Sequence, residues 1–147
     1  MWVQRLDLIG AVTACVIYIS SILVFSLRLA GQAAVGGVAG IPTLVAALPL
    51  VYLLITAPSV QRPAIYYVQV GLMLVWIGIL FLVDFWPGLE FRDRTPLVIV
   101  FVVLYFGGMG GMIGVASLAG RVWMLVSVSL FFVAAVLAFM SRWVTGM

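Results

Sequence analysis

Five long apolar runs set the strongest limit on what this chain can fold into. A helix needs about 20 residues to cross the hydrocarbon core of a bilayer, and runs near that length recur along the chain with few charges between them. Backbone polar groups in hydrocarbon must be paired within the protein, so spanning segments are helices or closed barrels. The runs are continuous and do not alternate, which favours helices. The sequence therefore predicts an all-α integral membrane protein with five transmembrane helices in a single bundle.

The predicted spans leave no room for a second domain. We expect helices over residues 8–27, 38–56, 64–86, 97–118 and 122–140, so that residues 1–147 form one transmembrane domain. The composition agrees, because 67% of the residues are hydrophobic and only 7% are charged. Five spans place the termini on opposite sides of the membrane. The arginines divide three against four between those sides, so the charge pattern does not orient the protein.

Three positions carry local structural predictions. Asp7 is expected at the start of the first helix, where the helix dipole favours an acid. Pro42 fits the first turn of the second helix, and Pro49 predicts a kink that frees a carbonyl group. Residues 31–40 are rich in small side chains and fit a loop, the beginning of a helix or a re-entrant segment, which the sequence does not distinguish.

The fourth run carries a cluster of five glycines after Phe106. Glycine costs about 1 kcal/mol against alanine in a water-exposed helix interior, and close contact with another backbone is the usual compensation in membrane helices. At about 100° per residue, one face holds Gly107, Gly110, Gly111, Gly114 and Ser117. We predict that this face is a helix-packing surface and that Gly108 points toward the other side.

The candidate functional polar residues are few: Gln69, Asp84, Glu90, Arg92, Asp93 and Arg94. Gln69 and Asp84 share one side of the third run, but about 22 Å separates them along a helix, so they cannot form one site. An acid inside a membrane is a functional hypothesis by default, although Asp84 is predicted near the edge, where hydration or an arginine partner suits it. Residues 87–96 are predicted to form a polar loop, either a solvated hairpin or a docking point for a partner subunit.

The missing residue types exclude several kinds of chemistry. The chain has no His and only one cysteine, Cys15. Without His there is no imidazole ligand for haem or chlorophyll and no His base. One thiol cannot build an iron–sulfur site or a thiolate zinc site. We therefore predict no catalytic residue, no metal site and no cofactor. The net charge of +3 comes from scattered arginines, which do not predict nucleic-acid binding.

These observations favour a role in packing over a role in chemistry. We predict a non-catalytic, multi-pass subunit of the cell membrane that packs within a larger complex, such as a bioenergetic or transport assembly. Its expected partners are the lipid bilayer and other membrane subunits or copies of itself. The alternative is a small oligomeric channel or transporter for a small solute or ion. A weaker alternative is a lipid-acting enzyme that uses Asp84 or the loop at 90–94.

Overall fold

The structure is a computed structural model that describes residues 2–32, 38–85 and 95–145, and within those ranges it contains helices and no strand. The helices are α1 (Trp2–Leu29), α3 (Ile41–Val45), α4 (Ala47–Thr56), the 3-10 helix η1 (Ala57–Val60), α5 (Ala64–Phe85), α6 (Thr95–Ser117) and α7 (Arg121–Thr145). Five segments are long and apolar enough to cross a membrane: Trp2–Leu29, Ile41–Val60, Ala64–Leu82, Pro96–Ser117 and Arg121–Val144. The predicted number of such helices is confirmed over the described residues.

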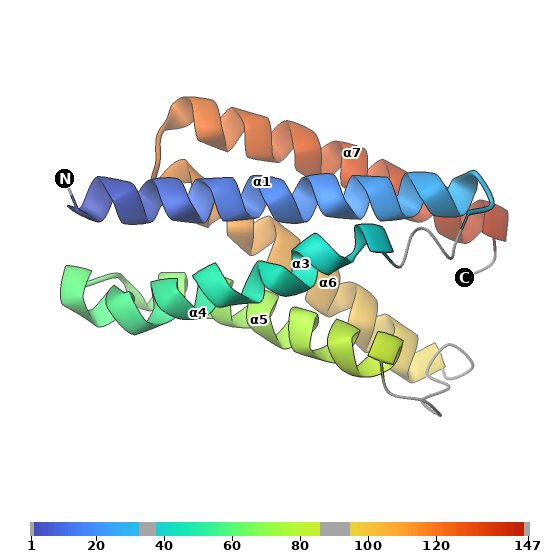
Figure 1. Cartoon of the computed structure of the whole chain (residues 1–147), viewed down its shortest axis with the longest axis horizontal. Coiled ribbons are helices and arrows are strands. Elements are labelled where there is room, and N and C mark those ends of the chain that lie inside the picture. The colour runs from blue at the N-terminus through green and yellow to red at the C-terminus, as the bar shows by residue number, and fades with distance from the viewer. Residues whose placement is uncertain (1, 33–37, 86–94, 146–147) are drawn as a thin grey trace.

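The long helices run alternately in opposite directions and form two pairs that a diagonal helix connects (Figure 1). Helices α1 and α7 lie side by side along the long axis, and α4 packs against α5 on the other side of the molecule. Helix α6 crosses between the pairs and contacts α5, α1 and α7. Helix α6 therefore connects the two pairs, and α1 adds direct contacts with α3 and α4.

Helix α1 begins at Trp2, six residues before the predicted start of the first span. Residues 2–7 contain neither Gly nor Pro, so nothing in them stops the helix. Asp7 therefore lies in the second turn, and the prediction that it caps the helix dipole was wrong. At the other end, Gly31 adopts φ +78°, and its N–H and that of the next residue bond to carbonyl oxygens of the last turn. Glycine suits this left-handed end of a helix.

The second span is built from three short helices in place of one. Pro42 lies in the first turn of α3, as predicted. The helix is then interrupted at Ala46, between α3 and α4. Pro49 explains the break, because its ring has no N–H to offer the carbonyl of Val45 and crowds that oxygen. Helix η1 follows α4 and ends at Gln61, which adopts the left-handed conformation with φ 53°.

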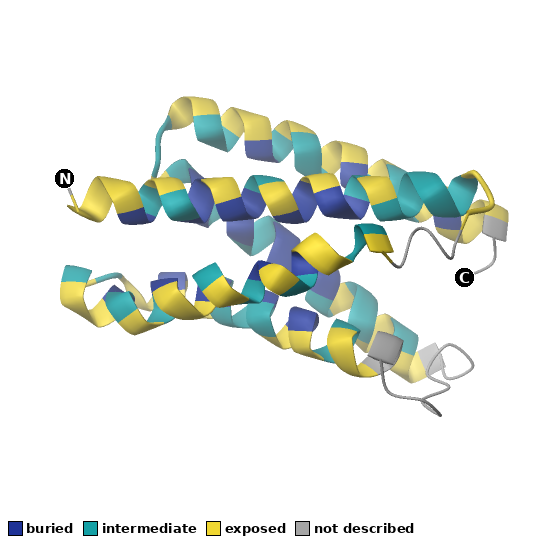
Figure 2. Ribbon diagram, viewed as in Figure 1, coloured by how far each residue is buried: buried dark blue, intermediate teal, exposed yellow. Residues whose placement is uncertain are grey.

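Small side chains allow α7 to lie close along α1. Among the described side chains of α7, the buried ones are Ser127, Ala134 and Ser141, which repeat at intervals of seven residues. A seven-residue repeat keeps one stripe facing a neighbouring helix. Several large side chains of α7, such as Phe132 and Phe139, are exposed, whereas Phe131 packs against the core. One narrow stripe of α7 therefore packs against the bundle, and most of its surface faces outward (Figure 2).

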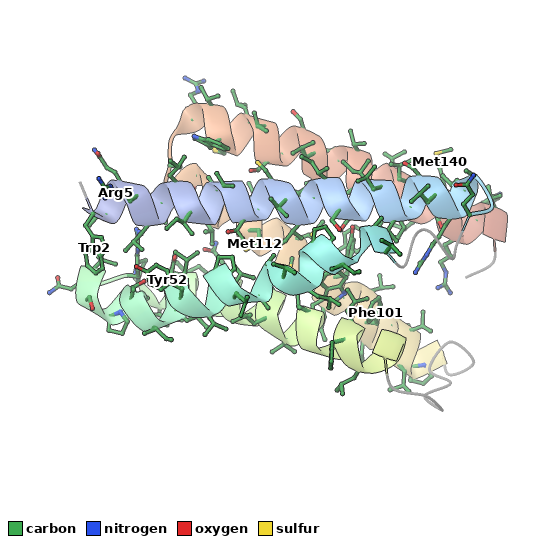
Figure 3. All side chains as sticks on the ribbon, viewed as in Figure 1. Trp2, Arg5, Tyr52, Phe101, Met112 and Met140 are labelled. Carbon is green, nitrogen blue, oxygen red and sulfur yellow. The ribbon has the colours of Figure 1, made fainter. Side chains whose placement is uncertain are left out.

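The interior is filled by large apolar side chains, and the exterior is apolar as well. The largest fully buried side chains are Tyr18, Ile17, Leu50, Leu53, Met73, Met109, Met112, Val70 and Val115. Exposed large hydrophobic residues occur on every one of the long helices, and Figure 3 shows such side chains projecting around the outside of the ribbon. A hydrophobic surface of this extent marks a face that contacts membrane or protein.

Candidate functional site

The glycine segment of α6 lies close to the backbone of α5. A Cβ added to Gly108 would lie 3.2 Å from the Cα atom of Met73 in α5. A Cβ added to Gly111 would lie 3.2 Å from the Cα atom of Gln69, one turn earlier in α5. Both distances end on backbone atoms, which cannot step aside as a side chain can. These two glycines therefore allow α5 and α6 to pack at short range.

Gly114 leaves room for the side chain of Gln69. An added Cβ would lie 2.2 Å from its Nε2 atom and 2.9 Å from its Cδ atom. The carboxamide of Gln69 thus occupies the space that a side chain at position 114 would need. Gln69, one of the predicted functional polar residues, therefore packs against α6 of its own chain.

Helix α6 also packs against α1. Here the glycine belongs to α1, because a Cβ added to Gly10 would lie 2.8 Å from Cγ1 of Val115. The Tyr18 hydroxyl of α1 donates a hydrogen bond to the backbone carbonyl of Met109 in α6, about one and a half turns before Val115. Met109 lies in the middle of the glycine segment, so this hydrogen bond connects α1 to that segment.

Two of the predicted packing glycines have no close neighbour within this chain. Nothing lies within 4 Å of a Cβ added to Gly110, and one added to Gly107 would meet only the end of Leu72, at 3.9 Å. The stripe that contacts α5 within 3.4 Å of an added Cβ therefore includes Gly108, which the sequence placed on the other side, together with Gly111 and Gly114 from the predicted face. The α5–α6 crossing selects this stripe, and the glycine spacing alone does not encode it. Contact between Gly107 or Gly110 and a second chain stays a prediction.

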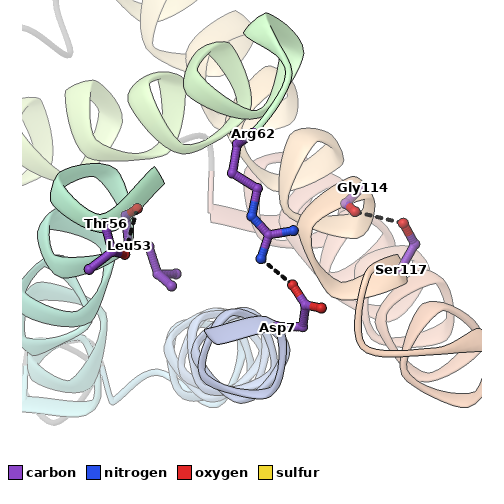
Figure 4. Close-up of polar contacts among 6 residues, drawn as sticks. All are labelled: Asp7, Leu53, Thr56, Arg62, Gly114 and Ser117. Carbon is purple, nitrogen blue, oxygen red and sulfur yellow. Dashed lines mark hydrogen bonds and ion pairs between the residues drawn. The ribbon is translucent and has the colours of Figure 1, made fainter. Parts of the chain in front are cut away.

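An ion pair joins the two helices that flank α6. A guanidinium nitrogen of Arg62, just before α5, contacts the Oδ1 atom of Asp7 in α1 (Figure 4). The two side chains are only 10% and 14% exposed, so much of the pair is shielded from solvent. Arg62 also lies over the ring of Tyr66, with 5.0 Å between its Cζ atom and the ring centroid. Gln61, with its left-handed backbone conformation, directly precedes Arg62.

Within the part of the chain that the structure describes, the remaining predicted site residues are not brought together. The Ser117 hydroxyl bonds to the carbonyl of Gly114 in its own helix, at 2.6 Å. Asp84 lies in the last turn of α5, 15 residues after Gln69 in the same helix, so the two are separate as predicted. Glu90, Arg92, Asp93 and Arg94 lie outside the described residues.

Sequence reasoning missed the Asp7–Arg62 pair, although a signal for it was present. Both charges flank apolar runs, and five alternating spans place the start of the first span and the turn after the second on one side. Two opposite charges at the same end of a mostly uncharged chain are natural partners. The stripe of Ser127, Ala134 and Ser141 was also missed, and its seven-residue spacing could have revealed it.

The geometry offers contact surfaces and little chemistry. Among the described residues, no group of three or more His, Cys, Asp or Glu side chains is placed to hold a metal ion. Comparison with protein-family models, with curated proteins and with solved structures finds no match to this chain. The candidate site is therefore the glycine segment of α6, with the Asp7–Arg62 pair that joins its neighbours.

Proposed function

We propose that this protein is embedded in a membrane and acts as a non-catalytic subunit that packs within a larger membrane complex. The observation that carries the proposal is the uncovered side of the glycine segment. Nothing lies within 4 Å of a Cβ added to Gly110. A Cβ added to any other predicted packing glycine of α6 would meet a neighbour within 4 Å. An uncovered glycine within a membrane helix exposes backbone to which another helix can pack closely.

The distribution of side chains supports a role as a packing element. The interior is closed by side chains such as Ile17, Met73 and Met112, all fully buried. The exterior is apolar along every long helix. Transport paths need polar groups that converge near the middle of the membrane. The buried residues among those described include no charged side chain. This favours a subunit that contributes surface over a carrier that works as a single chain.

Purification in a gentle detergent followed by mass spectrometry tests the proposal. We expect other membrane proteins to copurify at a fixed ratio to this chain. Purification of the chain alone would contradict the proposal. A pure homo-oligomer would support the alternative, a small oligomeric channel or transporter.

One observation favours that alternative. The open sides of Gly110 in α6 and of Gly71 and Gly78 in α5 have no neighbour within 4 Å of an added Cβ. In a ring of identical chains, such surfaces can line a narrow path between subunits. Flux of a small ion through liposomes that contain only this protein would support the alternative. The absence of flux from a homo-oligomer would count against it.

A further inference from the structure

Two neighbouring aromatic residues in the interior carry polar atoms without a hydrogen-bond partner. The indole Nε1 of Trp76 and the hydroxyl of Tyr105 are fully shielded, and each side chain is 5% exposed. A buried polar group that makes no hydrogen bond incurs its full desolvation penalty, and this penalty is high inside a membrane protein. Such groups in native proteins call for a partner.

The two groups belong to one place in the fold. Trp76 in α5 and Tyr105 in α6 pack edge to face, with 5.1 Å between ring centroids. From α1, the buried side chain of Ser21 lies next to the Tyr105 hydroxyl. Three helices thus bring three polar side chains to one position between the two helix pairs.

The aromatic rings that surround this position offer no hydrogen-bond acceptor to the polar atoms. The ring of Phe101 lies 5.9 Å from that of Trp76, and the ring of Phe25 lies 6.0 Å from that of Tyr105. Neither ring offers an oxygen acceptor to the indole N–H. The indole can only donate, whereas the hydroxyls of Tyr105 and Ser21 can both donate and accept. A shared partner must therefore accept at least one hydrogen bond and is best able to donate as well.

We propose that Trp76, Tyr105 and Ser21 form a binding site for one water molecule between α1, α5 and α6. Buried waters typically make about three hydrogen bonds to groups that lack protein partners, which is the number of polar side chains present here. No acid or arginine contributes to the site, so a neutral ligand fits it better than an ion. Water accepts from Trp76 and exchanges hydrogen bonds with the two hydroxyls.

The test is a double-mutant cycle with Tyr105→Phe and Trp76→Phe, read as unfolding of the full chain in mild detergent. Tyr105→Phe removes only an oxygen atom. If a water bridges the two residues, we expect this change to lower the folding equilibrium constant about fivefold or more. In the Trp76→Phe background it should have a clearly smaller effect, since the bridge is already broken. Tyr52→Phe removes the same atom from an exposed tyrosine of α4 and is the matched control, with no expected change in stability.

A spectroscopic measurement distinguishes water from other acceptors. The Raman difference spectrum between wild type and Trp76→Phe isolates the indole signal of Trp76. We expect its hydrogen-bond marker to report a bonded N–H, both before and after exhaustive lipid extraction. The proposal is overturned if Tyr105→Phe stabilises the protein, if the two changes are additive, or if the N–H is free. Loss of the bonded signal on extraction would also overturn it, because the acceptor would then be a lipid-soluble molecule.

Discussion

The two sides of the glycine segment in α6 place the same residue type in opposite surroundings. On one side, Gly108 and Gly111 meet the backbone of α5 at 3.2 Å from an added Cβ. On the other side, Gly110 has open space. The comparison teaches that a glycine-rich helix can serve two purposes within one turn. One side builds the chain's own fold, and the other is available to a neighbour.

The largest expected effect comes from the covered side. Gly111→Leu places a branched side chain against the Cα atom of Gln69, and overpacking of this kind costs up to about 3 kcal/mol. Gly108→Leu should cost a similar amount, because it meets the backbone of Met73. Equilibrium unfolding in mixed detergent micelles measures both changes. Wild-type stability in either variant would show that the close α5–α6 contact is not formed.

The next effect concerns the ion pair that holds α1 and α5 around α6. Asp7→Ala and Arg62→Ala should each destabilise the fold by about 2 kcal/mol, because each leaves a shielded charge without its partner. The double variant should cost clearly less than the sum of the two. Arg5→Ala is the matched control, since Arg5 lies in the same helix but is exposed. Additive losses would mean that the pair does not couple the helices.

A smaller effect is expected at Gly114, where the neighbour is a side chain. Gly114→Ala forces the carboxamide of Gln69 into another rotamer, at a cost of about 1 kcal/mol. In a Gln69→Ala background the same change should be nearly neutral. Comparison of the unfolding midpoints of the four proteins measures this. An equal loss in both backgrounds would assign the cost to the helix and not to Gln69.

The smallest effect is expected on the uncovered side. Gly110→Ala meets no atom of the chain within 4 Å and replaces glycine with a better helix former. The stability of the isolated protein should therefore change by no more than about 0.5 kcal/mol. Thermal unfolding of the purified chain checks this. A loss as large as that of Gly111→Leu would remove the distinction between the two sides.

The sequence was sufficient to predict the helices, but it was not sufficient to predict which sides of them pack together. Long apolar runs have one stable backbone solution in lipid, so five helices followed from hydrophobicity alone. Pro49 likewise predicted a kink, and the helix is interrupted nearby, at Ala46. The side of α6 that contacts α5 did not follow, because its five glycines span an arc of about 160° at 100° per residue, which is wider than one contact stripe. The choice of Gly108 over Gly110 depends on where Met73 and Gln69 lie, which is long-range information.

The polar contacts show the same division. Asp7 was assigned to a helix start by a local rule, yet its partner is Arg62, 55 residues away. Tyr18 was not singled out, although its hydroxyl bonds to the carbonyl of Met109. The helical spacing of polar residues reveals which side of a helix they share. It does not reveal which other helix lies opposite.

The most direct test of the proposed role compares wild type with Gly110→Leu in one copurification experiment. Both proteins are expressed in the native host, purified in gentle detergent and analysed by mass spectrometry. We predict that wild type brings other membrane subunits in a fixed ratio and that Gly110→Leu retains its own thermal stability but loses them. Purification of wild type without any partner would contradict the account, as would a Gly110→Leu variant that retains every partner at the wild-type ratio.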